Sequence, residues 1–248
     1  MIFSSKGVIE LLILDSHAHC GLTLPFERIR SLWDQGDIHG GVLFSPVEEI
    51  YDRGDRNFVD SPEFQKSRDD VHKYLESLKG ENIYIFWFVW NDFSYPGEEF
   101  SGIKWHRHAS EPKYLYGTKE CDVIIEDICE RQLPVILEEE FSNTLMLIEK
   151  FEKQTITIIP HLGNLNGGYE RLKEAGVFEN PFVYVDTSLA SPYQVKDFVS
   201  NYGSDRIMFG SDYPFGDPVD ECVKIKDLFS GEDLEKILAK NLLNLLYD

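Results

Sequence analysis

Residues 11–19 of the chain are LLILDSHAH, a short apolar run followed by a polar segment with two histidines. The apolar run predicts a buried β-strand at residues 11–15. Side chains alternate faces along a strand, so Asp15, His17 and His19 are expected to project to one side. Two imidazoles at this spacing can converge on one cation, and imidazole suits Zn, Fe, Ni or Cu. A single His-x-His pair is weak evidence, so the rest of the chain has to decide.

Seven more apolar runs follow, most of them separated by segments with helical periodicity. Strands are predicted at residues 11–15, 40–44, 83–89, 102–106, 133–138, 155–161, 182–186 and 206–210. Helices are predicted at residues 25–33, 62–79, 121–131, 142–153, 169–178, 192–202, 219–229 and 233–246. Alternating strands and helices predict an α/β protein with a parallel sheet, and eight strands fit a closed barrel.

The fold prediction is therefore a (β/α)8 TIM barrel, regular or distorted, formed by a single domain over residues 1–248. The rival is an open, doubly wound sheet. Such a sheet usually carries a glycine-rich phosphate loop at its first turn, and the sequence has none there.

Composition limits the classes of partner. The 248 residues are 42% hydrophobic and 13% aromatic, enough for a sizeable core. There are 24 basic and 44 acidic residues, a formal net charge of −20. This charge repels phosphate groups, so nucleic acid and anionic membranes are not expected partners, although solubility alone also accounts for it. The expected partner is a small-molecule substrate, and a homodimer stays open.

The cysteines indicate a reducing compartment. The four cysteines are scattered without Cys-x-x-Cys spacing, and the chain shows neither a signal-peptide pattern nor an apolar run of about 18 residues. We therefore expect a cytoplasmic protein. Cys20 follows His19, but on a strand it would face the opposite side, so it is predicted to pack in the core.

Polar residues occur at the predicted carboxyl ends of the strands, where barrel enzymes have their active sites. They are His17, His19, Lys104, His106, Glu138, His161, Asp186 and Asp212. Each has an ordinary alternative: His161 a satisfied core histidine, Asp212 a turn cap, Glu138 a solvated edge. A closed barrel, however, brings them to one mouth, where unpaired buried charges cost several kcal/mol each. A divalent cation would satisfy them together.

These segments, in this order, resemble the metal-dependent amidohydrolase superfamily over nearly the whole chain. The resemblance is to the amidohydrolase-2 branch, which includes aminocarboxymuconate semialdehyde decarboxylase and related lactone hydrolases. The matching pieces are DSHAH at 15–19, GIKWH at 102–106, LPVILE at 133–138, PHLG at 160–163, MFGSDYP at 208–214 and the last helix at 236–246.

The resemblance implies the ligands of the metal. His17 and His19 would bind it, and Asp212 would bind it and hold the attacking water. His161 would be a further ligand or the group that polarises the substrate and shuttles protons. Zn is the expected ion, with Mn, Fe and other transition metals open.

One position departs from the family pattern. The family normally has a metal-binding histidine where this chain has Glu138. Either Glu138 is itself a ligand, which we prefer because carboxylates bind Zn and Mn, or this ligand is lost and His106 compensates.

Lys104 and His106 are predicted to bind substrate. Some superfamily members carboxylate a lysine at this position to bridge two metal ions, but GIKWH looks more like the mononuclear branch, in which the lysine stays an amine. Arg107 and His108 are further positive groups that would line the mouth and hold an anionic substrate.

The predicted activity is hydrolysis of a small carboxylate-bearing or cyclic ester, lactone or amide by a metal-activated water. Asp212 and His161 are the predicted catalytic residues: Asp212 would accept the proton of the water, and His161 would stabilise the oxyanion or protonate the leaving group. Two alternatives stay open. One is non-oxidative decarboxylation, and the other is an inactive metal-binding barrel, which the Glu138 substitution keeps in consideration.

Overall fold

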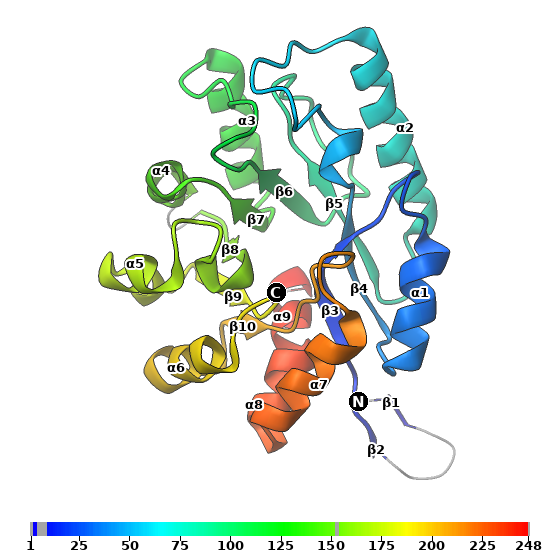
Figure 1. Cartoon of the computed structure of the whole chain (residues 1–248), viewed down its shortest axis with the longest axis vertical. Helices are drawn as coiled ribbons and strands as arrows, with labels where there is room; N and C mark the ends of the chain where they lie inside the picture. Colours follow the sequence, from blue (N-terminus) through cyan, green and yellow to red (C-terminus); the bar gives the residue numbers. More distant parts are fainter. Residues whose placement is uncertain (1, 4–8, 152–153, 248) are drawn as a thin grey trace.

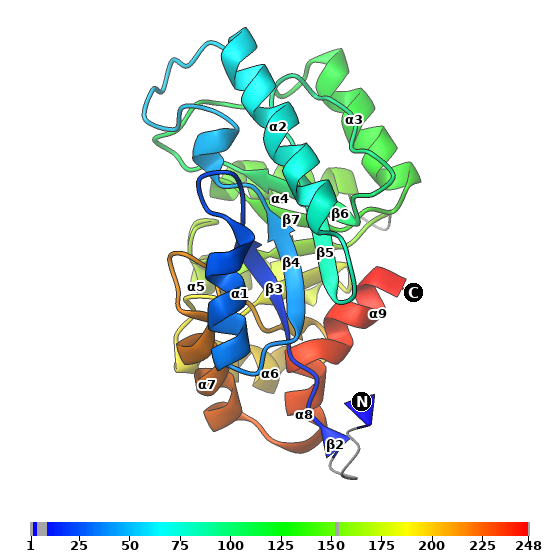
Figure 2. The same ribbon diagram turned by 90° about the vertical axis from the view of Figure 1, so that its right-hand side faces the viewer.

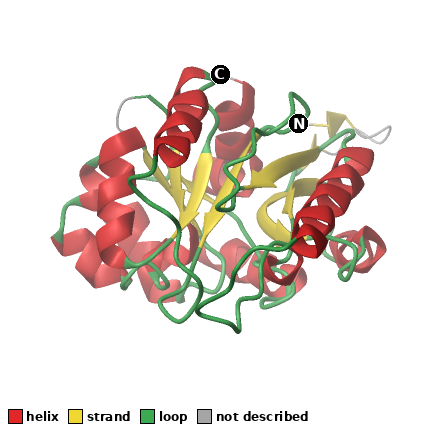
Figure 3. Cartoon of the chain, turned by 90° about the horizontal axis from the view of Figure 1, so that it is seen from above, coloured by secondary structure: helices red, strands yellow, loops and turns green. Residues whose placement is uncertain are grey.

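Eight parallel strands form a barrel with helices around its outside (Figures 1 and 3). The computed structural model describes residues 2–3, 9–151 and 154–247. The barrel strands are β3 (Leu14–His19), β4 (Gly40–Phe44), β5 (Ile83–Phe88), β6 (Gly102–His106), β7 (Val135–Glu138), β8 (Thr157–Ile159), β9 (Val183–Asp186) and β10 (Ile207–Met208). Each pairs with the next along the chain. The predicted (β/α)8 TIM barrel is confirmed.

Helices alternate with most of the strands, as the apolar periodicity predicts, and a loop without a helix joins β5 to β6. The helices are α1 (Phe26–Gln35), α2 (Pro62–Leu78), α3 (Lys119–Glu130), α4 (Phe141–Phe151), α5 (Tyr169–Glu174), α6 (Pro192–Tyr202), α7 (Pro218–Leu228), α8 (Gly231–Glu235) and α9 (Asn241–Tyr247). Figure 2 shows α1 and α2 beside strands β3 to β5. Residues 152–153, the end of one predicted helix, lie outside the described residues. None of the described helices has both the length and the apolar character needed to cross a bilayer.

The barrel closes at a seam between β3 and the segment after β10. In the described chain, regular strand pairing stops at these two edges, and single backbone hydrogen bonds join them. Ser16 N donates to Phe209 O at 2.8 Å, and Asp212 N donates to His17 O at 2.7 Å. His19 N donates to Tyr213 O at 2.8 Å. The barrel is therefore nearly closed, and its seam places Asp212 beside His17.

Apolar side chains fill the interior of the barrel below its mouth. Leu14, Val42, Phe86 and Ile136 pack there in one buried cluster, and Leu242 of α9 joins them. A second and larger cluster lies between the strands and the helices. Parallel strands covered on both faces need apolar residues on both, which explains their continuous apolar runs. Buried polar groups of the barrel are thus concentrated at the carboxyl ends of the strands.

Two element boundaries differ from the prediction in ways that affect function. The first barrel strand runs to His19, so the His-x-His pair lies within β3 and not beyond it. Strand β8 ends at Ile159, and His161 lies in the following 3-10 turn with φ 56°, in the left-handed region. Pro160 lacks an amide donor, which ends the ladder at this point. An N-terminal pair, β1 (Ile2–Phe3) and β2 (Ile9–Glu10), was not predicted.

His72 on α2 is a buried residue, although its place on a helix suggests a surface one. It is 3% exposed and stacks on Trp87 of β5, with ring centroids 3.6 Å apart. Neither ring nitrogen has a hydrogen-bond partner among the described residues. Burial, with a smaller contribution from the Arg68 charge, lowers the pKa of His72 to about 3. His72 is therefore neutral in the folded protein.

We expect His72→Phe to make the protein less sensitive to acid. The unfolded chain takes up a proton at His72 near pH 6.5 and the folded protein only near pH 3, so stability falls as the pH drops through this window. Phenylalanine keeps the ring contact and removes this loss. The free energy of unfolding, measured with urea, should rise by about 2 kcal/mol in the variant relative to wild type when the pH is lowered from 7.5 to 5. If the two proteins differed in free energy of unfolding by the same amount at both pH values, this account would be contradicted.

Candidate active site

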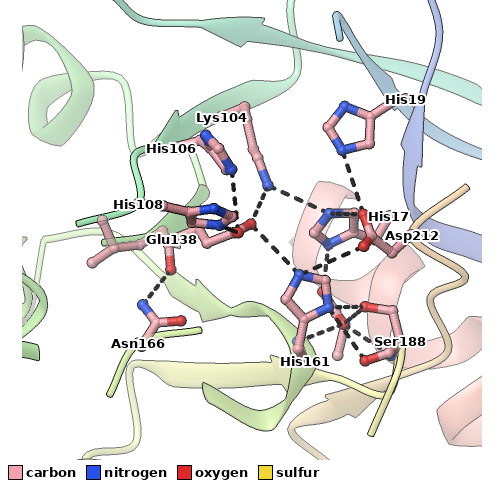
Figure 4. A network of polar contacts seen from close by, with 12 residues as sticks. His17, His19, Lys104, His106, His108, Glu138, His161, Asn166, Ser188 and Asp212 are labelled. Carbon is pink, nitrogen blue, oxygen red and sulfur yellow. Dashed lines mark hydrogen bonds and ion pairs between the residues drawn. The ribbon is translucent and has the colours of Figure 1, made fainter. Parts of the chain in front are cut away.

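Polar side chains from three strands (β3, β6 and β7) and two turns converge at the mouth of the barrel (Figure 4). The predicted residues that meet there are His17, His19, Lys104, His106, Glu138, His161 and Asp212. Each is at most 5% exposed. The sequence prediction that these distant residues share one site therefore agrees with their positions.

Three imidazoles face the carboxylate of Asp212. The Nε2 atoms of His17 and His19 lie 3.3 and 3.4 Å from Asp212 Oδ1. His161 Nε2 lies 3.9 Å from Asp212 Oδ2. Although burial opposes it, the contacts with His17 and His19 hold the pKa of Asp212 far below its usual value. Asp212 is thus an anion with three ring nitrogens around it.

The other ring nitrogen of each histidine is bound to a fixed acceptor. His19 Nδ1 lies 3.2 Å from Ser45 O, and His161 Nδ1 lies 3.3 Å from Ser188 O. A carbonyl oxygen only accepts, so both Nδ1 atoms must donate. His17 Nδ1 lies 2.8 Å from the carboxylate of Asp186. A neutral ring that donates from Nδ1 carries its lone pair on Nε2, and the Nε2 atoms of all three rings face Asp212. Although burial and the Lys104 charge oppose it, Asp186 and Asp212 raise the pKa of His17 to about 9, so without a metal ion His17 also carries a proton on Nε2.

Asp186 at the end of β9 positions two of these histidines. Its Oδ2 accepts from His17 Nδ1, while Oδ1 accepts from the backbone N of His161 at 3.0 Å. Oδ1 also accepts from the hydroxyl of Ser188, whose Oγ lies 2.8 Å from His161 Nδ1. Burial opposes ionisation, but the neighbouring His17 keeps the pKa of Asp186 below its usual value. The sequence places Asp186 at the mouth, and only the fold reveals this role.

Glu138 lies between two groups of side chains. Its Oε2 accepts from Lys104 Nζ at 3.0 Å and lies 3.5 Å from His161 Nε2. Its Oε1 lies 3.2 Å from His106 Nε2 and 2.5 Å from His108 Nε2. Burial is outweighed by the interactions with His106 and Lys104, so the pKa of Glu138 lies well below its usual value. His106 therefore lies on the far side of Glu138 from His17 and His161.

The side chains of Arg107 and Asp15 point away from the site, although the sequence predicts that they face it. Arg107 is buried, but its Nη1 contacts Glu139 and Glu140 at 3.1 and 2.8 Å, because neighbouring residues at the end of β6 point to opposite sides. Asp15 accepts from Trp33 Nε1 at 3.1 Å, away from the histidines. The register of β3 shifts between Asp15 and Ala18, and this irregularity breaks the alternation.

A cavity of about 150 Å³ opens above the site. Its polar lining includes His19, His106, His108, Glu138 and Asp212, and its apolar lining is Val47, Leu165, Leu189 and Phe215. Arg53, from the loop after β4, also lines it. This residue was not predicted, because nothing in the charged segment 47–61 distinguishes it. A larger groove of about 840 Å³ lies near Trp90 and contains none of these residues, so chemistry rather than size identifies the site.

The donor atoms fit a divalent transition metal ion. His17, His19 and Asp212 form one group whose ligand atoms lie within 4.8 Å of one another, and His17, Glu138 and His161 form a second. Imidazole nitrogen and carboxylate oxygen are ligands of Zn and of its neighbours in the transition series. The Nε2 atoms of the three histidines all face Asp212, so the possible ligand atoms point to one region.

Comparison with known proteins identifies the family. Residues 98–245 match the family described as Amidohydrolase (Amidohydro_2). The chain belongs to this family. The match confirms the resemblance derived from the sequence motifs, and members of the family are metal-dependent. No curated protein matches the chain.

Solved structures with the same fold come from enzymes of more than one reaction type. 5-Carboxyvanillate decarboxylase from Sphingomonas paucimobilis is 10% identical, with a TM-score of 0.72 over 96% of this chain and 99% of that chain. A candidate 2-pyrone-4,6-dicarboxylic acid hydrolase from Pseudomonas putida is 17% identical, with a TM-score of 0.67 over 96% and 98%. An amidohydrolase from Burkholderia multivorans with bound Zn is 11% identical, with a TM-score of 0.67 over 95% and 99%. At these identities the likeness shows the fold alone.

Asp186→Asn is expected to weaken metal binding. The amide cannot accept as strongly from His17 and leaves the orientation of His161 less defined. Loss of such a supporting carboxylate typically lowers metal affinity by about 10–100-fold. Chelator competition measures the affinity, and Asp197→Asn, which alters a carboxylate paired with Lys173 on the outside of the barrel, is the matched control. Equal affinities for the two variants would show that Asp186 does not support the site.

Metal content tests the two ligand assignments directly. We expect His17→Ala to lose most of its bound metal and Glu138→Ala to retain less than wild type, because each variant removes a donor atom. Elemental analysis of protein purified without chelator gives the metal-to-protein ratio. His39→Ala, a histidine that contacts the backbone of Ile13, serves as the control. Full metal occupancy in Glu138→Ala would mean that Glu138 is not a ligand.

Proposed function

We propose that this protein is a metal-dependent hydrolase of small carboxylate-bearing or cyclic esters, lactones or amides. The observation that carries the proposal is the convergence of three oriented histidine nitrogens on the ionised Asp212 in a buried mouth. Membership of the amidohydrolase family supports it.

His17, His19, Asp212 and Glu138 would hold the metal, with His161 as a further donor. Zinc is the ion we propose first, and the zinc-containing relative from Burkholderia multivorans supports that choice. A divalent cation in such a site supplies Lewis acidity and brings the pKa of water to about 7.

Asp212 is the proposed proton acceptor. Its Oδ1 faces His17 and His19, while Oδ2 faces His161 at 3.9 Å. A carboxylate that stays ionised can take the proton of the attacking water at Oδ2. His161 Nε2 lies on the same side and either completes the ligand set or passes the proton to the leaving group. The proposed acceptor and the proposed relay therefore lie on one side of the site, 3.9 Å apart, which is longer than a direct hydrogen bond.

The groups proposed to bind the substrate carboxylate line the cavity. His106 was predicted for this role, and His108 and Arg53 join it there. Lys104 also stays a substrate-binding prediction, but its ammonium group is fully buried against Glu138, His17 and the ring of Phe44. That position favours a different contribution: the Lys104 charge offsets that of Glu138 and keeps this carboxylate ionised.

Decarboxylation is the second candidate function. Similar folds occur in 2,6-dihydroxybenzoate decarboxylase from Rhizobium and in the Sphingomonas enzyme. The same site would then hold the carboxylate that is released as carbon dioxide, and His161 or Asp212 would supply the proton that replaces it.

One assay separates these functions. Metal-loaded protein is incubated with panels of lactones and hydroxybenzoates, and both ring opening and carbon dioxide release are followed. We expect metal-dependent ring opening, and Asp212→Asn should lower kcat by about 100-fold or more because the proton acceptor is lost. Asp205→Asn, on an exposed carboxylate, should leave it unchanged. Carbon dioxide release alone would establish the decarboxylase, and no turnover with metal bound would indicate an inactive barrel.

A further inference from the structure

The pocket above the site has two lobes. The cavity of about 150 Å³ described above is the inner lobe. A second cavity of about 180 Å³, the outer lobe, lies beside it. Four residues line both cavities: His19, Val47, Arg53 and Phe215. The two lobes therefore meet at these side chains and form one binding region.

Each lobe is large enough for one ring. An apolar cavity of about 150 Å³ in another protein binds benzene, which sets the scale for both volumes. A substrate with a single ring in the inner lobe, beside His19, Glu138 and Asp212, would leave the outer lobe unfilled.

The outer lobe suits a neutral, apolar group. Leu24, Pro46 and Pro214 are apolar residues that line this lobe and not the inner one. Thr23 lines it too, but its hydroxyl is already bound to the carboxylate of Glu49. Besides His19 and Arg53, which also line the inner lobe, the other polar residue of this wall is Glu48, whose carboxylate would repel a second anionic group. A hydrocarbon or aromatic group is therefore favoured there over a carboxylate.

Arg53 and Phe215 shape the junction of the lobes. Arg53 is held by Glu111, whose Oε1 lies 2.8 Å from Nε and 2.6 Å from Nη2, while Nη1 faces the exposed Glu48 at 3.2 Å. Phe215 is 62% exposed and meets the ring of His19 edge-on, with centroids 5.7 Å apart. An exposed phenyl ring at the entrance gains from burial when an apolar ligand covers it.

We propose that the substrate has two parts: an anionic, ring-sized head in the inner lobe and a neutral apolar group of about the size of benzene in the outer lobe. The assignment of the head rests on the proposed function, whereas the assignment of the distal group rests on the outer lobe itself. A monocyclic dicarboxylic acid would not use this second lobe.

Binding of two acids tests the proposal. Benzoate fills one lobe, and 4-benzylbenzoate adds a second phenyl ring through a methylene group that lets it turn at the junction. Calorimetry on the metal-loaded protein should show that 4-benzylbenzoate binds at least about tenfold tighter, as expected for burial of one phenyl group. Leu24→Trp fills the outer lobe, so the ratio of the two affinities should fall to about one. Leu22→Trp, in the same loop but outside both cavities, should keep the ratio.

A crystal structure with 4-benzylbenzoate provides a readout that does not depend on the variant folding. The second ring should contact Leu24 and Pro214. A ratio near one in wild type, an unchanged ratio in Leu24→Trp, binding of neither acid, or a second ring outside the lobe would each overturn the proposal. If the reaction proposal alone is wrong, the preference for 4-benzylbenzoate persists in protein that shows no turnover. If the lobe alone is wrong, turnover is present without the preference.

Discussion

Closure of the barrel between β3 and the segment after β10 is the constraint on which both fold and site depend. Asp15 holds this seam: its carboxylate accepts from the backbone N of Ser211 at 2.9 Å, from Ser211 Oγ at 2.6 Å and from Trp33 Nε1 on α1. Burial raises the pKa of Asp15 to about 6, and the hydrogen bonds to this carboxyl group offset the free-energy cost of burying it. The same seam binds Asp212 N to His17 O, which brings the first and last barrel segments together around one carboxylate.

The site gathers opposite charges within a strongly acidic protein. Asp186, Asp212 and Glu138 are all buried, and an isolated buried carboxylate would be costly. Each is therefore surrounded by groups that favour its ionised form: His17 beside Asp186, His17 and His19 beside Asp212, Lys104 and His106 beside Glu138. These contacts keep the buried carboxylates of the mouth ionised, as binding of a cation requires.

Side chains of β6 and of the segment after it contact Glu138, the residue that departs from the family pattern, and balance its charge. From the sequence motifs, the resemblance implies a metal-binding histidine at position 138, where this chain has a glutamate. Here two histidines of the β6 end, His106 and His108, both contact Glu138 Oε1, and Lys104 contacts Oε2. The negative charge introduced on β7 is thus balanced from β6. His106 supports this carboxylate from outside the group formed by His17, Glu138 and His161.

The sequence by itself determined the order of strands and helices, the barrel and most members of the site. These follow from local periodicity and from the rule that strand ends meet at one mouth, so His17, Lys104 and Asp212 could be placed at the mouth before their distances were known. Only the tertiary structure decided which neighbours face that mouth. Asp15 turns away because β3 is irregular, Arg53 reaches the cavity from a loop without a pattern, and Asp186 supports two histidines through contacts between distant segments. Such outcomes depend on strand register and loop path, which are set by packing across the barrel and have no local signature in the chain.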